Sequence, residues 1–274
     1  MEKFKNKLVL ALRRVRGNPQ DAVASAATRQ SKEGFPTEAK QFASVPKHIV
    51  LFPDGNRRWA KERGMDALEG HRAGFEKAVQ MFDWCQKRGV KALTVFGFST
   101  ENWNRTEKEV SYLMRLLETN LMEQLKKYGG EKAKDRGIRI RVIGQRERLP
   151  ESLQKVIAKV EETTKDNDKF FVTLAISYGG RWDIVSALQK MLKERIPPEK
   201  VTEDLFSEYL STAGLPEPDL VIRAGGEQRF SNFLLWQSAY AELYFYQKYW
   251  PDFTEQDLDD AIQEYQRRQR RFGK

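Results

Sequence analysis

The chain has 274 residues, of which 40% are hydrophobic, so it can form one large α/β domain or two small ones with a real core. Its net charge of +9 suits phosphorylated substrates, nucleic acid or an anionic membrane surface, and charge alone does not choose among them. One cysteine and two histidines exclude a disulfide framework and a His/Cys zinc site, and no apolar run is long enough for a transmembrane helix.

Residues 1–46 differ in composition from the rest of the chain. Five apolar residues near the start fall on one helical face, namely Phe4, Leu8, Ala11, Leu12 and Val15, among several lysines and arginines. This pattern predicts a basic amphipathic helix on a membrane surface; a frayed tail, or a helix packed on its own domain, is the alternative. Residues 17–40 predict a linker. We therefore expect an arm over 1–46, a domain over 47–274, and a cytoplasmic protein with peripheral membrane contact.

From His48 onward, predicted strands alternate with predicted helices. The strands are expected at 49–52, 93–98, 138–144, 170–177 and 219–224, with a weaker one near 243–248. The helices are expected at about 72–88, 107–128, 150–165, 181–195, 202–212 and 254–270. Such alternation predicts a single α/β domain with a mostly parallel central sheet and helices on both faces.

The helix predicted at 107–128 is the most strongly patterned of the set. Thr106 and Glu109 have the spacing of a capping box, which should start the helix. An apolar stripe then follows along one face, formed by Val110, Leu113, Met114, Leu117, Leu121 and Leu125. A stripe of this kind is most often plain core.

The strand predicted at 49–52 runs directly into Pro53-Asp54-Gly55-Asn56-Arg57-Arg58-Trp59, so Asp54 lies where a strand ends and a loop begins. In an open α/β sheet, ligands bind outside the carboxyl ends of the strands. Asp54 offers a hard anionic ligand for Mg²⁺, and Gly55 lets the backbone approach a ligand closely. Arg57 and Arg58 offer planar groups that suit phosphate oxygens. The segment predicts a metal diphosphate site; a surface turn with a solvated salt bridge is the alternative.

Three later stretches belong with this segment. They are Glu69-Gly70-His71-Arg72-Ala73-Gly74, then Phe98-Ser99-Thr100-Glu101-Asn102-Trp103-Asn104-Arg105, and a long stretch from Asp219 to Phe245 that contains Arg229-Phe230-Ser231-Asn232. Together with Asp54-Gly55-Asn56 they closely resemble the cis-prenyltransferase family, over about His48 to Gly273. The resemblance implies a Mg²⁺-dependent homodimer that adds isopentenyl diphosphate to an allylic diphosphate, usually farnesyl diphosphate, with a cis double bond each time. It further implies a long-chain polyprenyl diphosphate that serves as a cell-wall or glycan lipid carrier.

The resemblance also assigns roles to individual residues. Asp54 and Glu242 would serve the metal ion, and Asp54 would assist ionisation of the allylic diphosphate. That diphosphate would be held by Gly55, Asn56, Arg57, Arg58 and His71, and Trp59 would also bind substrate. The diphosphate of isopentenyl diphosphate would be held by Arg223, Arg229 and Ser231. Ser99 and Asn102 match positions of isopentenyl binding and proton removal beside Thr100 and Glu101, and Trp103, Arg105 and Glu109 match a mobile lid.

The hydrocarbon tail needs an apolar site, and the resemblance implies a tunnel above the sheet. The stripe of the helix at 107–128 would line it, with Gly97 near its entrance and Phe170 at its far end. Arg271-Phe272-Gly273 matches a C-terminal element that reaches the partner subunit's active site. Four residues depart from the bacterial pattern: Pro53 and Arg57, as in archaeal-type members, Ala67 in place of a diphosphate-binding arginine, and Ser177 in place of an asparagine.

Other classes of protein fit these residues less well. A phosphohydrolase with Asp54 as nucleophile would need a second aspartate where Asn56 stands, and a serine hydrolase would need a closing glycine where Glu101 stands. No Walker A or dinucleotide glycine pattern is present. The basic run 267–271 lacks a surrounding nucleic-acid module, so we expect no nucleic-acid partner. Two alternatives stay open within the family: a non-catalytic partner subunit, which would lack the catalytic aspartate, and a short-chain cis-prenyl diphosphate synthase.

Overall fold

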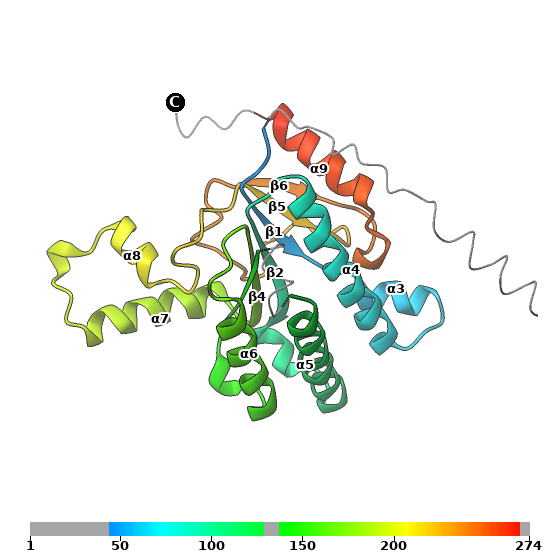
Figure 1. Ribbon diagram of the computed structural model, residues 1–274, viewed down its shortest axis with the longest axis horizontal. Coiled ribbons are helices and arrows are strands. Elements are labelled where there is room, and N and C mark those ends of the chain that lie inside the picture. The colour runs from blue at the N-terminus through cyan, green and yellow to red at the C-terminus, as the bar shows by residue number, and fades with distance from the viewer. Residues whose placement is uncertain (1–43, 129–136, 269–274) are drawn as a thin grey trace, which may run out of the picture. The chain divides into compact units, whose positions relative to one another are not determined.

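The apolar runs of the sequence form one six-stranded sheet in the computed structural model, which describes residues 44–128 and 137–268 (Figure 1). The strand order is β3-β4-β2-β1-β5-β6, and every neighbouring pair is parallel. The strands are β1 (His48–Phe52), β2 (Ala92–Ser99), β3 (Ile138–Ile143), β4 (Phe170–Tyr178), β5 (Leu220–Arg223) and β6 (Glu242–Phe245). The predicted α/β fold with a parallel central sheet is confirmed. The predicted arm helix and linker, and Arg271-Phe272-Gly273, lie outside the described residues.

Seven α-helices connect these strands within the described residues. They are α3 (Asn56–Glu62), α4 (Ala67–Lys87), α5 (Glu107–Tyr128), α6 (Glu151–Thr164), α7 (Gly180–Lys193), α8 (Glu203–Tyr209) and α9 (Glu255–Arg267). Helix α3 is absent from the sequence prediction, which placed this segment in a loop. Helix α4 begins five residues before its predicted start at residue 72, because Asp66 caps it by accepting a hydrogen bond from the backbone N–H of Leu68 at 2.9 Å.

The two faces of the sheet are covered differently. The larger core cluster packs one face of the strands against α4, α5, α6 and α9, with Met81, Leu117, Leu153 and Leu258 among the buried helical residues. The smaller cluster on the other face, around Val50 and Ala175, is covered by Phe233 and Leu234 and by Trp182 of α7. Helix α7 and a loop segment thus cover the second face together, so helices contribute to both faces as predicted.

Helix α7 carries apolar residues that nothing within the described chain covers. Val185, Leu188 and Leu192 are 51%, 50% and 66% exposed and lie at helical spacing on one side of α7. In Figure 1, α7 and α8 form the arm of the ribbon at the left of the view. Within the described ranges, no helix is long and apolar enough to cross a membrane.

Candidate active site

The centre of the site is an ion pair between the ends of two neighbouring strands. Strands β1 and β5 pair so that Phe52 lies opposite Arg223, and Asp54 follows two residues after Phe52. The Arg223 guanidinium donates from Nη2 to Asp54 Oδ2 at 2.8 Å and from Nη1 to Ser231 Oγ at 2.9 Å. It also donates to the carbonyl of Arg229. The Arg223 side chain is 5% exposed and that of Asp54 is 35% exposed, so the carboxylate faces the solvent side of the pair.

Gly55 turns the chain from Asp54 into α3. Its φ of 94° lies in the left-handed region, and an added Cβ would lie 2.6 Å from the ring of Tyr249. The turn directs the Gly55 N–H to Asp54 Oδ1 at 2.6 Å. The first turn of α3 then places Arg58 near the same carboxylate, with its Nη2 3.5 Å from Asp54 Oδ1. Asp54 thus lies between two guanidinium groups.

Glu227 joins the arginines of the two predicted diphosphate sites. Its Oε1 lies 3.3 Å from Arg58 Nη1, and its Oε2 lies 2.5 Å from Arg229 Nη1. The Arg58 and Arg229 side chains are 42% and 62% exposed. An anion entering from solvent can therefore reach both guanidinium groups, and it would exchange with the Glu227 carboxylate when it does so.

The loop after β5 is strained at the site. Ser231, Asn232 and Leu234 are non-glycine residues with φ of 44°, 63° and 44°. The conformations of Ser231 and Leu234 are unfavourable and persist only where surrounding structure holds them, whereas asparagine tolerates this region. Ser231 is held by its hydrogen bond to Arg223, and Asn232 donates to Glu101 Oε1 at 2.9 Å. These contacts hold the loop against the segment that follows β2.

A second charged cluster lies beside the first and contains Glu109, which the sequence associated with helix capping and the lid. Glu109 Oε1 is 3.1 Å from His71 Nε2, 3.0 Å from Arg105 Nη1 and 3.8 Å from Arg57 Nε. Burial lowers the pKa of His71, although the hydrogen bond to Glu109 acts in the opposite direction. The lowered pKa keeps the imidazole neutral near pH 7. Burial alone would raise the pKa of Glu109, but the hydrogen bond from His71 and the charge of Arg105 outweigh it, so the pKa is lowered.

The predicted capping box at Thr106 is only half formed, because Glu109 faces this cluster. Its backbone N–H donates to Thr106 Oγ1 at 3.4 Å, whereas its carboxylate contacts His71 and Arg105. The reciprocal box is found one segment earlier. There the side chains of Ser99 and Asn102 cap each other's backbone, with the Ser99 N–H donating to Asn102 Oδ1 at 3.0 Å. This lock fixes both residues at the end of β2.

Ser177, a departure from the bacterial pattern, has an identifiable role. Its φ of 53° is in the left-handed region, which asparagine also tolerates. Its hydroxyl accepts from Trp103 Nε1 at 2.8 Å and donates to Gln145 Oε1 at 3.1 Å. Arg148 lies over the other side of this arrangement, 4.8 Å from the Trp103 ring. Ser177 therefore anchors the segment that follows Ser99.

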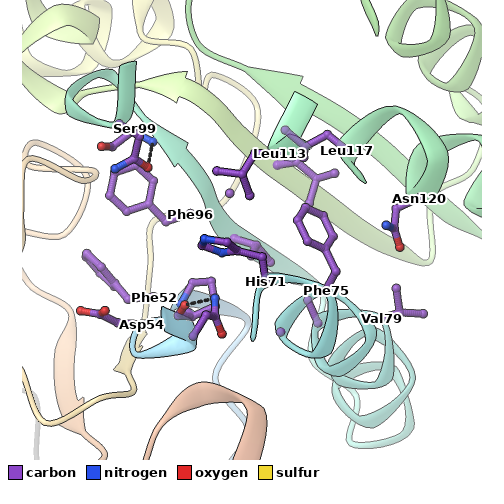
Figure 2. Close-up of a pocket in the computed structure, with 18 of the residues that line it drawn as sticks. Phe52, Asp54, His71, Phe75, Val79, Phe96, Ser99, Leu113, Leu117 and Asn120 are labelled. Atoms are coloured by element: carbon purple, nitrogen blue, oxygen red, sulfur yellow. Dashed lines mark hydrogen bonds between the residues drawn. The ribbon is translucent and has the colours of Figure 1, made fainter. Parts of the chain in front are cut away.

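Two adjoining cavities meet at Asp54. The first, here called the tunnel, has a volume of about 570 Å³ and runs between β2, α4 and α5 (Figure 2). The second, here called the polar pocket, is lined by the start of α3 with Arg57, Arg58 and Lys61, and by Ala67. Asp54, Asn56, His71 and Arg105 line both cavities. A ligand with a charged head and an apolar tail would fit with its head between the cavities and its tail in the tunnel.

The tunnel interior is apolar. Figure 2 shows Phe75 pointing toward Leu117 and Val79 nearest to Asn120 in the view, with Asp54 and Ser99 on the opposite side of the view from Val79. The predicted stripe thus lines the cavity at Leu113, Leu117 and Leu121, while Met114 is buried in the core. Gly97 lines the tunnel as predicted, at an irregularity where β2 shifts register against β4.

Phe170 is not part of the tunnel wall, and its predicted place there is wrong. It begins β4, is fully buried in the main core and does not line the cavity. The residues that line the tunnel near its α5 end are Asn120, Leu121 and Gln124.

The structure does not bring every predicted residue to the site. Glu242 begins β6, three residues before Phe245, which lies opposite Arg223. At about 3.3 Å per residue, this places Glu242 about 10 Å along the strands, toward their amino ends. There its carboxylate pairs with Arg268 at 3.2 Å. Within one chain, Glu242 therefore does not meet Asp54 at a common metal ion.

Three further predicted residues lie at the margin. Trp59 donates from Nε1 to Asp252 at 2.7 Å and lines neither cavity. Thr100 and Trp103 also line neither cavity, although their neighbours Ser99, Glu101 and Asn102 line the tunnel. Trp103 packs against Phe98 and Arg148 instead, so it supports the neighbouring residues that line the tunnel.

Two residues at the site were not among the predicted binding or catalytic residues. Glu109 had been associated with helix capping and the lid, and its pairing with His71 depends on α4 and α5 lying side by side. Glu227 carried a signal, since it stands between Gly226 and Arg229 in a stretch with several cations. Its pairing with Arg58 links positions 169 residues apart, which the sequence pattern alone does not disclose.

Comparison with known proteins agrees with this architecture. Residues 52–273 match a family model described as undecaprenyl diphosphate synthase. An isoprenyl transferase from Neisseria meningitidis is 45% identical over 85% of this chain and 92% of its own length. A ditrans,polycis-undecaprenyl-diphosphate synthase from Pseudomonas putida, specific for (2E,6E)-farnesyl diphosphate, is 43% identical over 85% and 92%. The crystal structure of lavandulyl diphosphate synthase from Lavandula x intermedia, in complex with dimethylallyl diphosphate, superposes with a TM-score of 0.79 at 40% identity, covering 84% of this chain and 99% of that one. The chain therefore belongs to the undecaprenyl diphosphate synthase family of prenyltransferases.

Proposed function

We propose that this prenyltransferase condenses isopentenyl diphosphate with an allylic diphosphate, farnesyl diphosphate in the first instance, and repeats the step with a cis double bond each time. The observation that carries the proposal is the tunnel itself, which has guanidinium groups, a carboxylate and an imidazole at one end and an apolar interior. A prenyl diphosphate has the same division into a charged head and an apolar tail.

The proposed reaction breaks the allylic carbon–oxygen bond and forms a bond between that carbon and the double bond of isopentenyl diphosphate. The departing diphosphate gains charge in the transition state, so cations around Asp54 would stabilise it. We assign the allylic diphosphate to the polar pocket, with Gly55, Asn56, Arg57, Arg58 and His71. We assign the second diphosphate to Arg223, Arg229 and Ser231, so that the two reacting carbons meet above Asp54.

The partners already present support this division. Arg223 is buried with its Nε lacking a hydrogen-bond partner in the described part of the chain, so it has donor capacity that an incoming phosphate would use. Ser99 and Asn102 are locked against each other and lie on the tunnel wall. Neither side chain is a strong base, and we assign the departing proton to a diphosphate oxygen held beside them.

The donor set suits Mg²⁺ as a proposed cofactor. No group of three or more His, Cys, Asp or Glu side chains forms a metal site in residues 44–128 and 137–268, so protein ligands alone would not hold the ion. Mg²⁺ is commonly bound by one or two carboxylates together with substrate phosphates, and Asp54 supplies a half-exposed carboxylate beside the polar pocket. Asp54 would hold the ion, which when bound would neutralise charge on the leaving diphosphate.

We propose a homodimer built on α7. The exposed Val185, Leu188 and Leu192 form an uncovered apolar face, and such a face typically packs against a partner. The membrane contact proposed for the arm rests on its sequence alone.

A long-chain product, such as undecaprenyl diphosphate, is the proposed outcome. Gly97 leaves the tunnel wall open, and the Pseudomonas putida relative bears the name of an undecaprenyl diphosphate synthase. The lavandulyl diphosphate synthase has a similar fold, with a TM-score of 0.79, which keeps a short-chain cis-prenyl diphosphate synthase as the second candidate.

The test is an assay with labelled isopentenyl diphosphate, Mg²⁺ and a set of allylic primers, followed by sizing and stereochemical analysis of the products. Chains longer than the primer with cis bonds at each addition would support the proposal. A protein that joins substrates once and stops would favour the short-chain candidate. Absence of any condensation would favour the non-catalytic partner subunit.

A further inference from the structure

The tunnel changes character along α5. Leu113 and Leu117 lie near Phe75 of α4 in its first part, and all three side chains are apolar (Figure 2). One turn further along α5, Asn120 and Gln124 take the next positions on the same side of the helix, at the spacing that places residues in line. Two amides therefore join Leu121 on the wall that follows the purely apolar part.

Gln124 is a buried amide without a complete set of partners. It is 7% exposed, it lines the tunnel, and its Oε1 has no hydrogen-bond partner among the described residues. Asn120 donates from Nδ2 to the Leu116 carbonyl at 2.8 Å, within its own helix. A buried amide oxygen with no protein donor is satisfied only by water or by a ligand that carries a donor.

An ion pair lies beyond these amides. Lys127 of α5 reaches Asp83 of α4, with Nζ 3.5 Å from Oδ2. The α5 residues that line the tunnel are thus, in order, Leu113, Leu117, Asn120, Leu121 and Gln124, and Lys127 lies beyond them, so polar groups appear only toward this end of the tunnel.

A growing prenyl tail would meet these groups in that order. Each unit added within the apolar part transfers hydrocarbon out of water, which is favourable. A unit that passes Asn120 and Gln124 displaces the water that satisfies the amides, and the hydrocarbon offers no hydrogen bond in return. The tunnel has a volume of about 570 Å³ and both amides line it, so a tail that fills the tunnel reaches both of them.

We propose that Asn120 and Gln124 determine product length by ending the apolar part of the tunnel. The inference rests on the proposed chain elongation and adds which residues stop it. Neither amide touches the reacting groups, so they act on when elongation ends and not on the chemical step.

The experiment uses the full-length protein with labelled isopentenyl diphosphate and farnesyl diphosphate, and sizes the dephosphorylated products by reverse-phase chromatography. Gln124→Met keeps the length of the side chain and removes the amide, and Asn120→Leu does the same at the other position. Both variants should shift the product distribution upward by about one isoprene unit or more. Gln124→Glu, which places a charge at the same point, should shift it downward.

Glu123→Met is the matched control, because Glu123 is the exposed neighbour of Gln124 on the same helix. It should leave the distribution unchanged. The rate of the first condensation should be within about twofold of wild type in every variant, which separates a change in length from damage to the fold. A wild-type protein that elongates, with the same products from Gln124→Met and Asn120→Leu, would overturn the inference alone. A wild-type protein that elongates no primer would overturn the proposed function and this inference with it.

Discussion

Arg223 and Asp54 form an ion pair across the carboxyl ends of two adjacent strands, with Arg223 Nη2 2.8 Å from Asp54 Oδ2. The guanidinium is almost fully buried, and a buried cation is costly unless it is paired. Asp54 therefore stabilises Arg223 before any substrate arrives. An arriving diphosphate can take over part of this role, which would free the carboxylate for a metal ion.

The two proposed diphosphate sites predict opposite kinetic effects for two arginines. Arg229→Ala should raise the Michaelis constant for isopentenyl diphosphate about tenfold, because a hydrogen bond to a charged group is worth roughly 1.5–3 kcal/mol. Arg58→Ala should instead raise the constant for the allylic diphosphate. Steady-state kinetics with each substrate varied in turn measures both.

Glu227 supplies the control for these variants, since it pairs with both arginines. Each alanine variant leaves the Glu227 carboxylate with one partner fewer, and its negative charge then repels a diphosphate more strongly. Glu227→Gln removes this charge and leaves both arginines in place. Equal effects of Arg229→Ala and Arg58→Ala on both substrates would mean that the sites are wrongly assigned.

His48 predicts a pH dependence of stability away from the site. Its Nδ1 lies 2.7 Å from the Pro216 carbonyl, which only accepts, so Nδ1 carries the proton and Nε2 accepts from Thr94 at 2.8 Å. Burial lowers the pKa of His48 from 6.5 to about 4. As the pH falls, His48 is therefore protonated in the unfolded chain before it is protonated in the folded one. The free energy of unfolding should fall by about 3 kcal/mol between pH 6.5 and 4.

Urea denaturation at several pH values, for wild type and His48→Asn, measures this contribution. Acidic groups titrate in the same range and affect both proteins, so the difference between the two curves isolates the histidine. The wild-type protein should lose more stability than the variant on acidification. Parallel curves would show that His48 is not a buried neutral imidazole.

The sequence predicted most of the fold because its elements are long and periodic. All six strands lie where expected, and α5 spans the predicted residues 107–128. Helix α3 was missed because it has seven residues and begins after Gly55, which offers no side-chain cap. Short helices of this kind are stabilised by packing, here against α4, which no local pattern reveals.

The sequence predicted which candidate site residues lie at the ends of strands, but not which strands are neighbours in the sheet. Asp54 and Arg223 each follow or end a predicted strand, and the expectation that they share one edge of the sheet agrees with their contact. Their contact depends on β5 lying beside β1, which is a matter of strand order. The same strand order and register separate Glu242 from Asp54, although sequence resemblance had assigned both to the metal.

Gly97 predicts a test of the tunnel entrance. A Cβ at this position would lie 3.4 Å from the Ala175 carbonyl and 4.0 Å from Leu117 Cδ2, so alanine fits and the rest of a leucine has to enter the tunnel. Gly97→Leu should therefore shift products toward short chains and spare the first condensation. Gly97→Ala is the control and should resemble wild type. An unchanged long-chain distribution in the leucine variant would show that the tail takes another path.

The N-terminal arm predicts membrane binding that is separable from catalysis. Removal of residues 1–16 should weaken binding to anionic vesicles, since each lysine or arginine near the surface contributes about 1 kcal/mol. Turnover with a soluble primer should change little. Sedimentation with vesicles of anionic and of neutral lipid measures the effect, and equal partitioning of the full-length and shortened proteins would favour a frayed tail.

The most direct test of the account is the turnover of Asp54→Ala and Asp54→Asn beside wild type, together with binding of isopentenyl diphosphate to each protein. If Asp54 assists ionisation and holds Mg²⁺, both variants should lose nearly all turnover. Binding of isopentenyl diphosphate should persist, above all in Asp54→Asn, which keeps an acceptor for the buried Arg223. A variant that retains more than about a tenth of the wild-type rate, a barrier change below ~1.4 kcal/mol, would contradict the role proposed for Asp54.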